Sequence, residues 1–497
     1  MTRRTKWLLR LSPGLFLLLL ALPARAQSLQ KRLDRTLDAA PLNRHLWGVS
    51  VADTSGKLLY TRNGDRLFIP ASNTKLVVTA AAAVLLPPDF TVVTSAYGSG
   101  PLTDGVLQGH LVLYGRGDPT MAERCFAADT MQAGVCSKDA FEPLRQLART
   151  LKAHGVRTIA GDVVGDGSYF EPELLHPTWE HDDLPWWYAA PVSGLGLSDN
   201  SLRLTTRPAQ IGAPAELGLA PWLGNVTLEN RTRTVAEDQP RTLDVSREPC
   251  SNGFIVAGDI PVNGRDRPDY VAVSDPNHYA ALAFRQVLAE EGIAVLGATR
   301  GTTDSLLYRA ARQTAPLAEV TSRPLSDWIF PILNTSQNWY AEMLLKQLGR
   351  RFGGGGSWRE GLAVERRFLI DSVRADSTQF SLSDGSGLSA VNLVSPQTFV
   401  QLLAYMRRHP RYSTWAPGLP KSGQPGSLRT RFVSTPFEGR VTAKTGSIST
   451  VNSLSGYVER ADGRTLIFSI QANHHRLGGR SMIAAIDSVV AAIGSGK

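Results

Sequence analysis

The feature that most constrains this chain is the apolar stretch at residues 76–86, which directly follows the sequence Pro-Ala-Ser-Asn-Thr-Lys at residues 70–75. The stretch is apolar nearly all round, which predicts a helix buried inside a domain. Pro70 suits the start of a helix, and Pro87 and Pro88 end it after roughly four turns. Other elements of the chain must therefore cover this helix on every side.

The same segment places a serine and a lysine on one face of the helix. Residues three apart are neighbours on a helix, so the amine of Lys75 is expected near the hydroxyl of Ser72. A serine is a poor nucleophile unless a base lies beside it, and a desolvated lysine with a lowered pKa is such a base. Ser28 and Lys31 have the same spacing. The pattern therefore indicates a catalytic centre only together with further motifs.

Two further motifs strengthen this interpretation. The sequence Ser-Gln-Asn at 336–338 precedes a second helical pattern at 339–346, and Lys-Thr-Gly at 444–446 closes a strand-like run. A second Ser-x-Asn, at 198–200, also lies between the other two motifs. We prefer 336–338, because a helical pattern follows it and because 198–200 lies in a segment with the texture of an inserted domain.

The first residues have the pattern of a secretory signal peptide. Four basic residues, an apolar run at 15–22 and the small-residue site Ala-Arg-Ala at 24–26 predict a leader, residues 1–26, that is cleaved before Gln27. The apolar run is too short to span a membrane, and no other stretch approaches about 20 apolar residues. We therefore expect a periplasmic protein without a transmembrane anchor.

The charge of the chain argues against nucleic-acid binding. The formal net charge is +9, from 53 basic and 44 acidic residues, and the leader carries five of the basic residues and no acidic one. The mature chain is therefore only mildly basic, at +4. Weak attraction to an anionic envelope surface is the most that this charge indicates.

Three cysteines in an exported chain suggest one disulfide and one spare thiol. Cys125 with Cys136 is the favoured pair, and Cys250 is then free, although all three thiols in the reduced state is the alternative. No C-x-x-C pair or H-E-x-x-H motif occurs, and the nine histidines are scattered. We expect neither a metal nor another cofactor.

The two ends of the chain predict one antiparallel sheet. A hairpin pattern occupies 47–62, a second occupies 453–471, and the second directly follows the strand at 440–446. Helical patterns at 29–37 and 482–493 are expected to cover the sheet. The fold class is therefore α+β, with helices on both faces of the sheet and an all-helical cluster beside it that carries Ser72 and Ser336.

The middle of the chain has a different sequence pattern from its two ends. Short β-like runs separated by Gly, Pro and Asp extend from about residue 96 to residue 275, and helical periodicity resumes at 278–290. We therefore expect a catalytic domain made of 27–95 and 276–497. Residues 96–275 are expected to form a large, mostly β inserted region.

With the three motifs in this order, the chain resembles the class C low-molecular-mass penicillin-binding proteins, the exported D-alanyl-D-alanine carboxypeptidases and endopeptidases. This resemblance implies the penicillin-binding/serine β-lactamase-like fold, with a large insertion after the nucleophile helix. Gln337 departs from the family, where Asp is more usual at the middle position of the second motif. Further segments that carry the resemblance are Gly115–Pro119, Tyr188–Asn200, Asp384–Ser389, Leu419–Pro420 and Gly423–Gly426.

The resemblance implies a catalytic role for four residues. Ser72 would attack the carbonyl between two D-alanines and form an acyl-enzyme, while Lys75 takes its proton. Ser336 would relay a proton toward the leaving amine, and Asn338 would orient Lys75 or the substrate amide. The identity of the base is contested among relatives, so Ser336 sharing this role with Lys444 is an alternative.

The resemblance also implies a substrate-binding role for the third motif. Lys444 would hold the terminal carboxylate as a point charge, helped by the Thr445 hydroxyl. The backbone N–H groups of Ser72 and Ser447 would form the oxyanion hole. Gly446 is interpreted as a position kept small so that substrate can lie along the strand edge.

The leading hypothesis is a periplasmic serine-type D-Ala-D-Ala carboxypeptidase or endopeptidase that acts on peptidoglycan stem peptides and is acylated by β-lactam antibiotics. A β-lactamase or esterase on the same fold is one alternative. A non-catalytic cell-wall-binding protein is another, although binding alone requires no nucleophile and base. The inserted region is expected to serve wall docking or partner binding, and the sequence leaves a homodimer open.

Overall fold

The computed structural model describes residues 28–122, 139–248, 251–264 and 268–495. The expected leader and all three cysteines lie outside these residues, so the cleavage site and the pairing of Cys125 with Cys136 stay predictions. Within the described ranges, no helix has both the length and the apolar character needed to cross a membrane.

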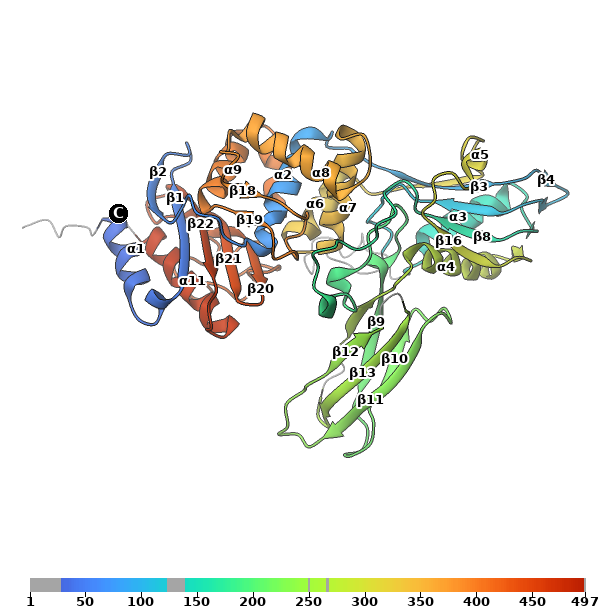
Figure 1. The fold of residues 1–497 in the computed structure, drawn as a ribbon, viewed down its shortest axis with the longest axis horizontal. Coiled ribbons are helices and arrows are strands. Elements are labelled where there is room, and N and C mark those ends of the chain that lie inside the picture. Colours follow the sequence, from blue (N-terminus) through green and yellow to red (C-terminus); the bar gives the residue numbers. More distant parts are fainter. Residues whose placement is uncertain (1–27, 123–138, 249–250, 265–267, 496–497) are drawn as a thin grey trace, which may run out of the picture.

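One five-stranded antiparallel sheet joins the two ends of the chain (Figure 1). Its strand order is β2-β1-β22-β21-β20. The strands are β1 (Leu46–Ala52), β2 (Leu58–Arg62), β20 (Val441–Ile448), β21 (Val451–Glu459) and β22 (Thr465–Asn473). Both predicted hairpins are present, and Val49 of the first lies opposite Ile470 of the second. The strand that ends the third motif, β20, forms one edge of the sheet.

Helices cover both faces of this sheet, as the α+β assignment predicted. Helices α1 (Leu29–Asp38) and α11 (Gly479–Gly494) pack on one face, where Leu33 and Val489 are fully buried with the strand residues. Helix α9 (Pro396–Arg408) packs on the other face against β1 and β22.

A helical cluster lies beside the sheet and surrounds helix α2 (Lys75–Leu85). Every residue of α2 from Lys75 to Ala83 is buried, as its apolar sequence predicted. The first residues of the expected helix form a 3₁₀ turn instead, Ala71–Thr74. The other helices of the cluster are α6 (Leu325–Leu333), α7 (Asn338–Phe352), α8 (Trp358–Arg367) and α10 (Tyr412–Trp415).

The inserted region has an α/β part (Figure 1). Its main sheet has the order β16-β8-β6-β3-β17, and a smaller sheet has the order β15-β7-β5-β4. The strands are β3 (Val93–Gly98), β4 (Leu102–Thr103), β5 (Val106–Leu107), β6 (Leu111–Tyr114), β7 (Thr158–Ile159), β8 (Val163–Asp166), β15 (Ala294–Val295), β16 (Thr299–Thr302) and β17 (Ala318–Thr321). The helices are α3 (Glu142–Ala153), α4 (Pro276–Glu290) and the short α5 (Arg309–Arg312).

The boundary expected at residue 275 is wrong. Strand β16 pairs with β8 and strand β17 pairs with β3, so the sheet of the inserted region continues to Thr321. Helix α4 belongs to the same core, because Phe284 and Val287 pack there with Leu144 of α3. The helical pattern at 278–290 was identified correctly, but the pattern alone does not show which sheet the helix covers.

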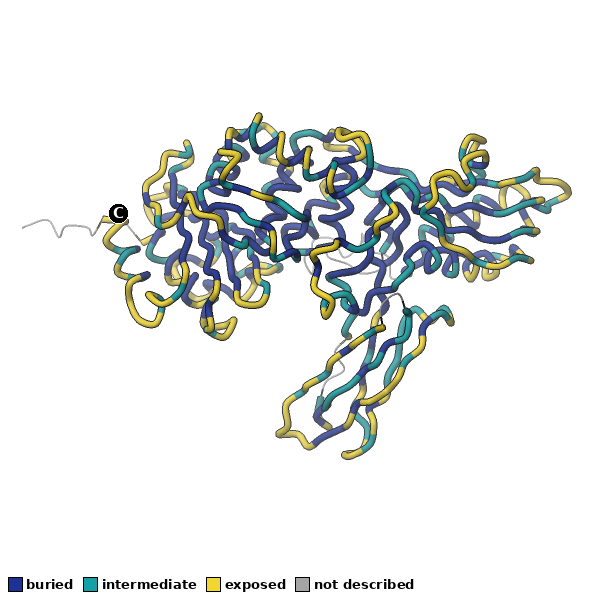
Figure 2. The backbone as a smooth tube through the Cα atoms, viewed as in Figure 1, coloured by how far each residue is buried: buried dark blue, intermediate teal, exposed yellow. Residues whose placement is uncertain are grey.

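The second part of the inserted region is a pair of three-stranded sheets that projects from the rest of the chain (Figure 1). One sheet contains β9 (Ser201–Arg207), β10 (Glu216–Ala220) and β14 (Asp269–Ala272). The other contains β11 (Thr227–Val235), β12 (Asp244–Arg247) and β13 (Gly253–Pro261). We call residues 201–272 the sandwich. Figure 2 shows that its strands are far more exposed than those of the five-stranded sheet.

Candidate active site

Ser72 lies in the 3₁₀ turn that precedes α2, at the junction between the helical cluster and the sheet. Ala71 adopts a left-handed backbone conformation with φ 47°, which turns the chain sharply just before the serine. Asn73 is fully buried and donates a hydrogen bond of 2.7 Å to the Ser455 hydroxyl on β21. The turn is therefore fixed to the sheet, and the Ser72 side chain is left half-buried.

Lys75 is fully buried and its amine has three neighbours. Its Nζ lies 2.9 Å from Ser72 Oγ, 2.7 Å from Asn338 Oδ1 and 2.5 Å from the Ser386 carbonyl oxygen. A neutral amine has two N–H groups and one lone pair. It can donate to the amide and the carbonyl while its lone pair accepts the hydroxyl proton of Ser72.

Burial also favours the neutral form of this amine. It lowers the pKa of Lys75 to about 7, and the carboxylates of Asp384 and Glu342 oppose this shift. A base with a pKa near neutrality is available to take a proton without excessive cost at physiological pH. The 2.9 Å between Lys75 Nζ and Ser72 Oγ also confirms the prediction that the two side chains lie together.

Ser336 and Lys444 form a second pair at the same site. Lys444 is fully buried, and its Nζ donates to Ser336 Oγ at 2.8 Å and to its neighbour Thr445 O at 2.8 Å. Burial and the nearby charge of Lys75 hold the pKa of Lys444 well below its usual range. Because the Ser336 oxygen accepts from this lysine, its own hydrogen is free to point toward a bound substrate.

The Ser-Asp-Asn sequence at 198–200, the alternative to the middle motif, contacts that motif in the structure. Gln337 donates to Asp199 at 3.0 Å and accepts from the Trp339 N–H at 3.0 Å, so it caps α7. Asn338 donates to the Tyr188 carbonyl at 2.8 Å, which orients its amide oxygen toward Lys75. Asp199 of the 198–200 motif thus supports the middle motif through Gln337.

The third motif lies on β20, with one side of that strand facing the Ser72 turn. Gly446 is required there for a reason that the sequence did not indicate. A Cβ at this position would lie 2.2 Å from Ser453 Oγ, 2.7 Å from the Pro70 carbonyl oxygen and 3.0 Å from the Ser72 nitrogen. The missing side chain therefore lets the strand approach the turn that carries Ser72. Ser447 follows at the exposed end of the strand.

Several groups around Lys75 were not found from the sequence. The Ser386 carbonyl carries no sequence signature, because any residue supplies a backbone oxygen. Glu342 accepts hydrogen bonds from the N–H groups of Gly385 and Ser386 at 3.1 and 2.7 Å. Its position four residues after Asn338, on the same helix face, was the one available signal.

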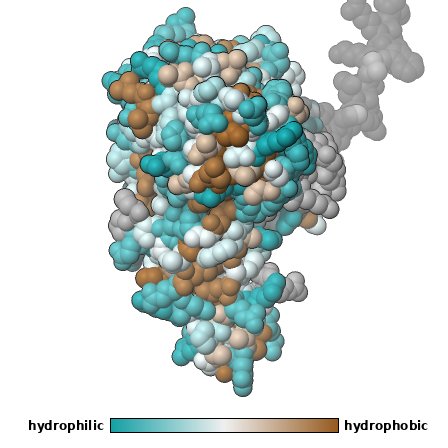
Figure 3. Space-filling view, turned by 90° about the vertical axis from the view of Figure 1, so that its right-hand side faces the viewer, coloured by the Kyte–Doolittle hydropathy of each residue, from teal (hydrophilic) through white to brown (hydrophobic). Residues whose placement is uncertain are grey.

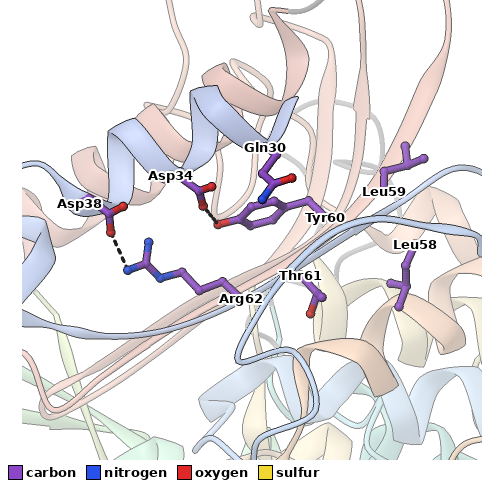
Figure 4. Close-up of a pocket in the computed structure, with 8 residues that line it drawn as sticks. All are labelled: Gln30, Asp34, Asp38, Leu58, Leu59, Tyr60, Thr61 and Arg62. Atoms are coloured by element: carbon purple, nitrogen blue, oxygen red, sulfur yellow. Dashed lines mark hydrogen bonds and ion pairs between the residues drawn. The ribbon is translucent and has the colours of Figure 1, made fainter. Parts of the chain in front are cut away.

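A hollow on the opposite edge of the sheet, between α1 and β2, does not share this chemistry (Figure 4). Its polar groups bond to one another: Tyr60 donates to Asp34 at 2.8 Å and Arg62 to Asp38 at 2.7 Å. Over the part of the chain that the structure describes, no group of three or more His, Cys, Asp or Glu side chains is placed to hold a metal.

Comparison with protein families and curated proteins gives consistent matches. The model of the D-Ala-D-Ala carboxypeptidase 3 (S13) family matches residues 29–493. A D-alanyl-D-alanine carboxypeptidase of Actinomadura sp. (strain R39) is 34% identical over 481 residues, which cover 94% of this chain and 84% of that protein. The D-alanyl-D-alanine carboxypeptidase DacB of Haemophilus influenzae is 26% identical over 427 residues, covering 84% of this chain and 82% of that one.

Solved structures show the same fold. The crystal structure of penicillin binding protein 4 (dacB) from Haemophilus influenzae superposes with a TM-score of 0.77 at 23% identity, covering 92% of this chain and 97% of that one. A second structure of that protein, in complex with a β-lactam, gives a TM-score of 0.72 at 22% identity, with 93% and 97% covered. The inserted region is included in this coverage.

Proposed function

The chain belongs to the D-Ala-D-Ala carboxypeptidase 3 (S13) family, and on that premise we propose that it cleaves the D-Ala-D-Ala bond of peptidoglycan stem peptides through an acyl-enzyme on Ser72. Family membership makes it a serine-type carboxypeptidase of the penicillin-binding class. The assignment of the catalytic residues rests on one observation above all. Lys75, buried and held by two acceptors, lies 2.9 Å from the Ser72 hydroxyl.

In the first half-reaction Ser72 Oγ bonds to the carbonyl carbon while its proton passes to Lys75 Nζ. The N–H groups of Ser72 and Ser447 hold the carbonyl oxygen as it becomes negative. The C–N bond then breaks as Ser336, bonded to Lys444, gives a proton to the departing amine of D-alanine. The proton on Lys75 restores the Ser336 hydroxyl.

In the second half-reaction water replaces the departed amine. Lys75, or Lys444 through the Ser336 hydroxyl, takes a proton from the water as the water oxygen bonds to the acyl carbon, and the bond to Ser72 breaks. Ser72 regains its proton, and the shortened peptide leaves with a new carboxyl group, which releases its proton to the solvent.

Lys444, Thr445 and Ser427 form the proposed carboxylate site. A bound carboxylate would favour the protonated form of the buried Lys444 amine, which then supplies the positive charge. The Thr445 hydroxyl donates to Ser427 Oγ at 3.0 Å, which leaves the Ser427 hydroxyl free as a neutral donor. These groups lie on or beside the edge strand of the sheet, so a peptide added along β20 brings its terminal carboxylate to them.

We also propose that β-lactams acylate this chain and that it acts in the periplasm. A β-lactam carries a strained amide and a carboxylate in the places of the D-Ala-D-Ala bond and its terminal carboxylate, so Ser72 is expected to open it and stay acylated. The β-lactam complex of the Haemophilus influenzae protein supports this expectation. The leader pattern of residues 1–26 and the cell-wall substrate of the family support the location.

The test is release of D-alanine from a synthetic peptide that ends in D-Ala-D-Ala. We expect turnover by the wild-type chain and none by Ser72→Ala. Ser28→Ala is the matched control, because Ser28 and Lys31 repeat the motif spacing at the exposed start of α1. Turnover by Ser72→Ala near the wild-type rate would reject Ser72 as the nucleophile.

A further inference from the structure

Helix α7 carries a buried polar stripe that the proposed reaction uses only in part. Asn338, Glu342 and Lys346 follow one another at intervals of four residues, so they share one face of the helix. All three are buried, and Glu342 and Lys346 are fully so. Asn338 contacts Lys75 directly, whereas neither Glu342 nor Lys346 has a role in the steps above.

Glu342 faces the loop that supplies the third contact of Lys75. Every backbone N–H from residue 385 to residue 389 donates to an acceptor inside this loop or on α7. Gly385 and Ser386 donate to Glu342, Gly387 and Ser389 donate to Asp384, and Leu388 donates to Ser386 Oγ. With its N–H groups held in this way, the loop presents the Ser386 carbonyl to Lys75 at 2.5 Å.

The loop also touches the nucleophile turn. Gly387 has φ +79°, and a Cβ there would lie 1.9 Å from the carbonyl oxygen of Ala71, directly before Ser72. A displacement of this loop would therefore disturb the base and the nucleophile together. Its position depends on the two carboxylates, Glu342 and Asp384, that hold its N–H groups.

The hydrogen-bond partners of Glu342 favour its ionised form, whereas burial opposes it. Besides the two loop N–H groups, the indole N–H of Trp358 donates to it at 2.8 Å, so its partners are all donors. A carboxylate accepts all three, whereas an amide oxygen with an adjacent NH₂ accepts only some of them. Burial raises the pKa of Glu342 to about 7, with a further contribution from the charge of Asp384.

We propose that Glu342 is a positioning residue for the base: it fixes the 384–389 loop so that the Ser386 carbonyl holds Lys75, and its negative charge favours the protonated amine. This inference rests on the proposed function, because it concerns the same base. Glu342 does not touch substrate in this proposal. It determines where, and at which pH, Lys75 takes the proton.

The direction of the pH effect follows from the charges around these two groups. Glu342 and Asp384 raise the pKa of Lys75, while burial lowers it. The positive charge of Lys75 in turn lowers the pKa of Lys444. The other titratable groups near Glu342 are Asp384, Lys346 and Glu365, and His176 lies near Asp384 and Lys346. Removing the charge of Glu342 should therefore lower the pKa of Lys75 and move the acid limb of the rate profile to lower pH.

The test compares the second-order rate of acylation by benzylpenicillin across pH for three variants. Glu342→Gln removes the charge and part of the loop's hydrogen bonding, so we expect the plateau rate to fall by about tenfold or more and the acid limb to move to lower pH. Glu342→Asp keeps the charge but shortens the side chain, so we expect a lower plateau with the limb in place.

Glu365→Gln is the matched control. Glu365 is equally buried on neighbouring α8, burial raises its pKa well above the usual range, and neither carboxyl oxygen has a hydrogen-bond partner among the described residues. Because these oxygens hold none of the loop N–H groups, replacing this carboxyl by an amide should leave both the plateau and the acid limb unchanged.

The outcomes separate the inference from the proposed function. Failure of benzylpenicillin to acylate the wild-type chain would overturn the proposed function. With the wild-type chain acylated, a folded Glu342→Gln variant with an unmoved limb or an unchanged plateau would overturn the inference. If Glu342→Gln does not fold, Glu342→Asp decides: a lower plateau with the limb in place supports the inference, and a wild-type plateau or a displaced limb overturns it.

Discussion

At the scale of single residues, the site depends on two lysines that the fold buries away from water. Lys75 and Lys444 are both fully buried, and each touches one motif serine, Ser72 or Ser336. An exposed lysine is protonated at neutral pH and has no lone pair to offer. Burial is what makes a lysine useful as a base without a histidine.

The first prediction concerns the pH dependence of acylation. Below its pKa of about 7, Lys75 is protonated and cannot take the proton of Ser72. The acylation rate with benzylpenicillin should therefore rise as the pH increases through about 7 and level off above it. Rapid-mixing measurements from pH 5 to pH 9 would check this. A limb near the ordinary lysine value of about 10 would contradict the assigned environment.

The second prediction concerns the loss of the base. Lys75→Ala should reduce acylation by about 10²- to 10⁴-fold, the usual range for a general base. The same acylation assay measures the change, and thermal unfolding of the variant controls for its stability. A small reduction in a folded variant would move the role of base to Ser336 with Lys444.

The groups of the site were predictable from the sequence only where they are side chains of a motif. Ser72, Lys75, Ser336 and Lys444 were found by their order and spacing, and the structure brings them together. The Ser386 carbonyl was not predictable, because a backbone oxygen leaves no trace in the sequence.

At the scale of elements, the contact between β20 and the Ser72 turn holds Ser72 against the sheet. The third prediction is that Gly446→Ala abolishes most acylation, because the added methyl would overlap Ser453 Oγ and the Pro70 carbonyl oxygen. Gly478→Ala is the control, since a Cβ there meets nothing within 4 Å. Acylation by Gly446→Ala at the wild-type rate would show that the strand and the turn do not need this close approach.

Elements with strong local patterns were predictable, and their partners were less so. The α2 stretch and both hairpins of the central sheet were identified by composition and periodicity. The role of α4 was not, because an amphipathic helix pattern shows that one face is covered but not by which sheet. The long-range pairing of β16 and β17 decided that question.

At the scale of the whole molecule, the inserted region is proposed to meet the cell wall or a partner. Figure 3 shows the end of the molecule formed by this region, where hydrophobic groups alternate with hydrophilic ones down the face. Large exposed hydrophobic side chains of the inserted region are Leu102, Ile211, Trp222, Val262, Leu296, Leu306 and Leu307.

The fourth prediction concerns the sandwich. Leu204 and Asp269 lie opposite each other in neighbouring antiparallel strands, so a short Gly/Ser linker can replace residues 205–268. The shortened chain should be acylated by benzylpenicillin like the full chain but should release less product from purified sacculi. Equal action of both chains on sacculi would contradict a role in docking.

A control separates docking from support of the site. Arg247 of the sandwich donates to the Leu184 carbonyl at 2.9 Å, close in sequence to Tyr188, whose carbonyl holds Asn338. Arg247→Ala in the full chain removes this contact but keeps the surface of the sandwich. It should therefore act on sacculi like the wild-type chain, and a loss equal to that of the shortened chain would assign the effect to the contact.

The central claim is that Ser72 is the nucleophile of a penicillin-binding carboxypeptidase. The most direct measurement is the intact mass of the purified chain after brief incubation with benzylpenicillin, beside Ser72→Ala and an assay of the remaining drug. We predict a lasting adduct of one drug molecule on the wild-type chain and none on the variant. An unmodified wild-type chain would contradict the claim, pointing to a β-lactamase if the drug is consumed and to a wall-binding protein if it is not.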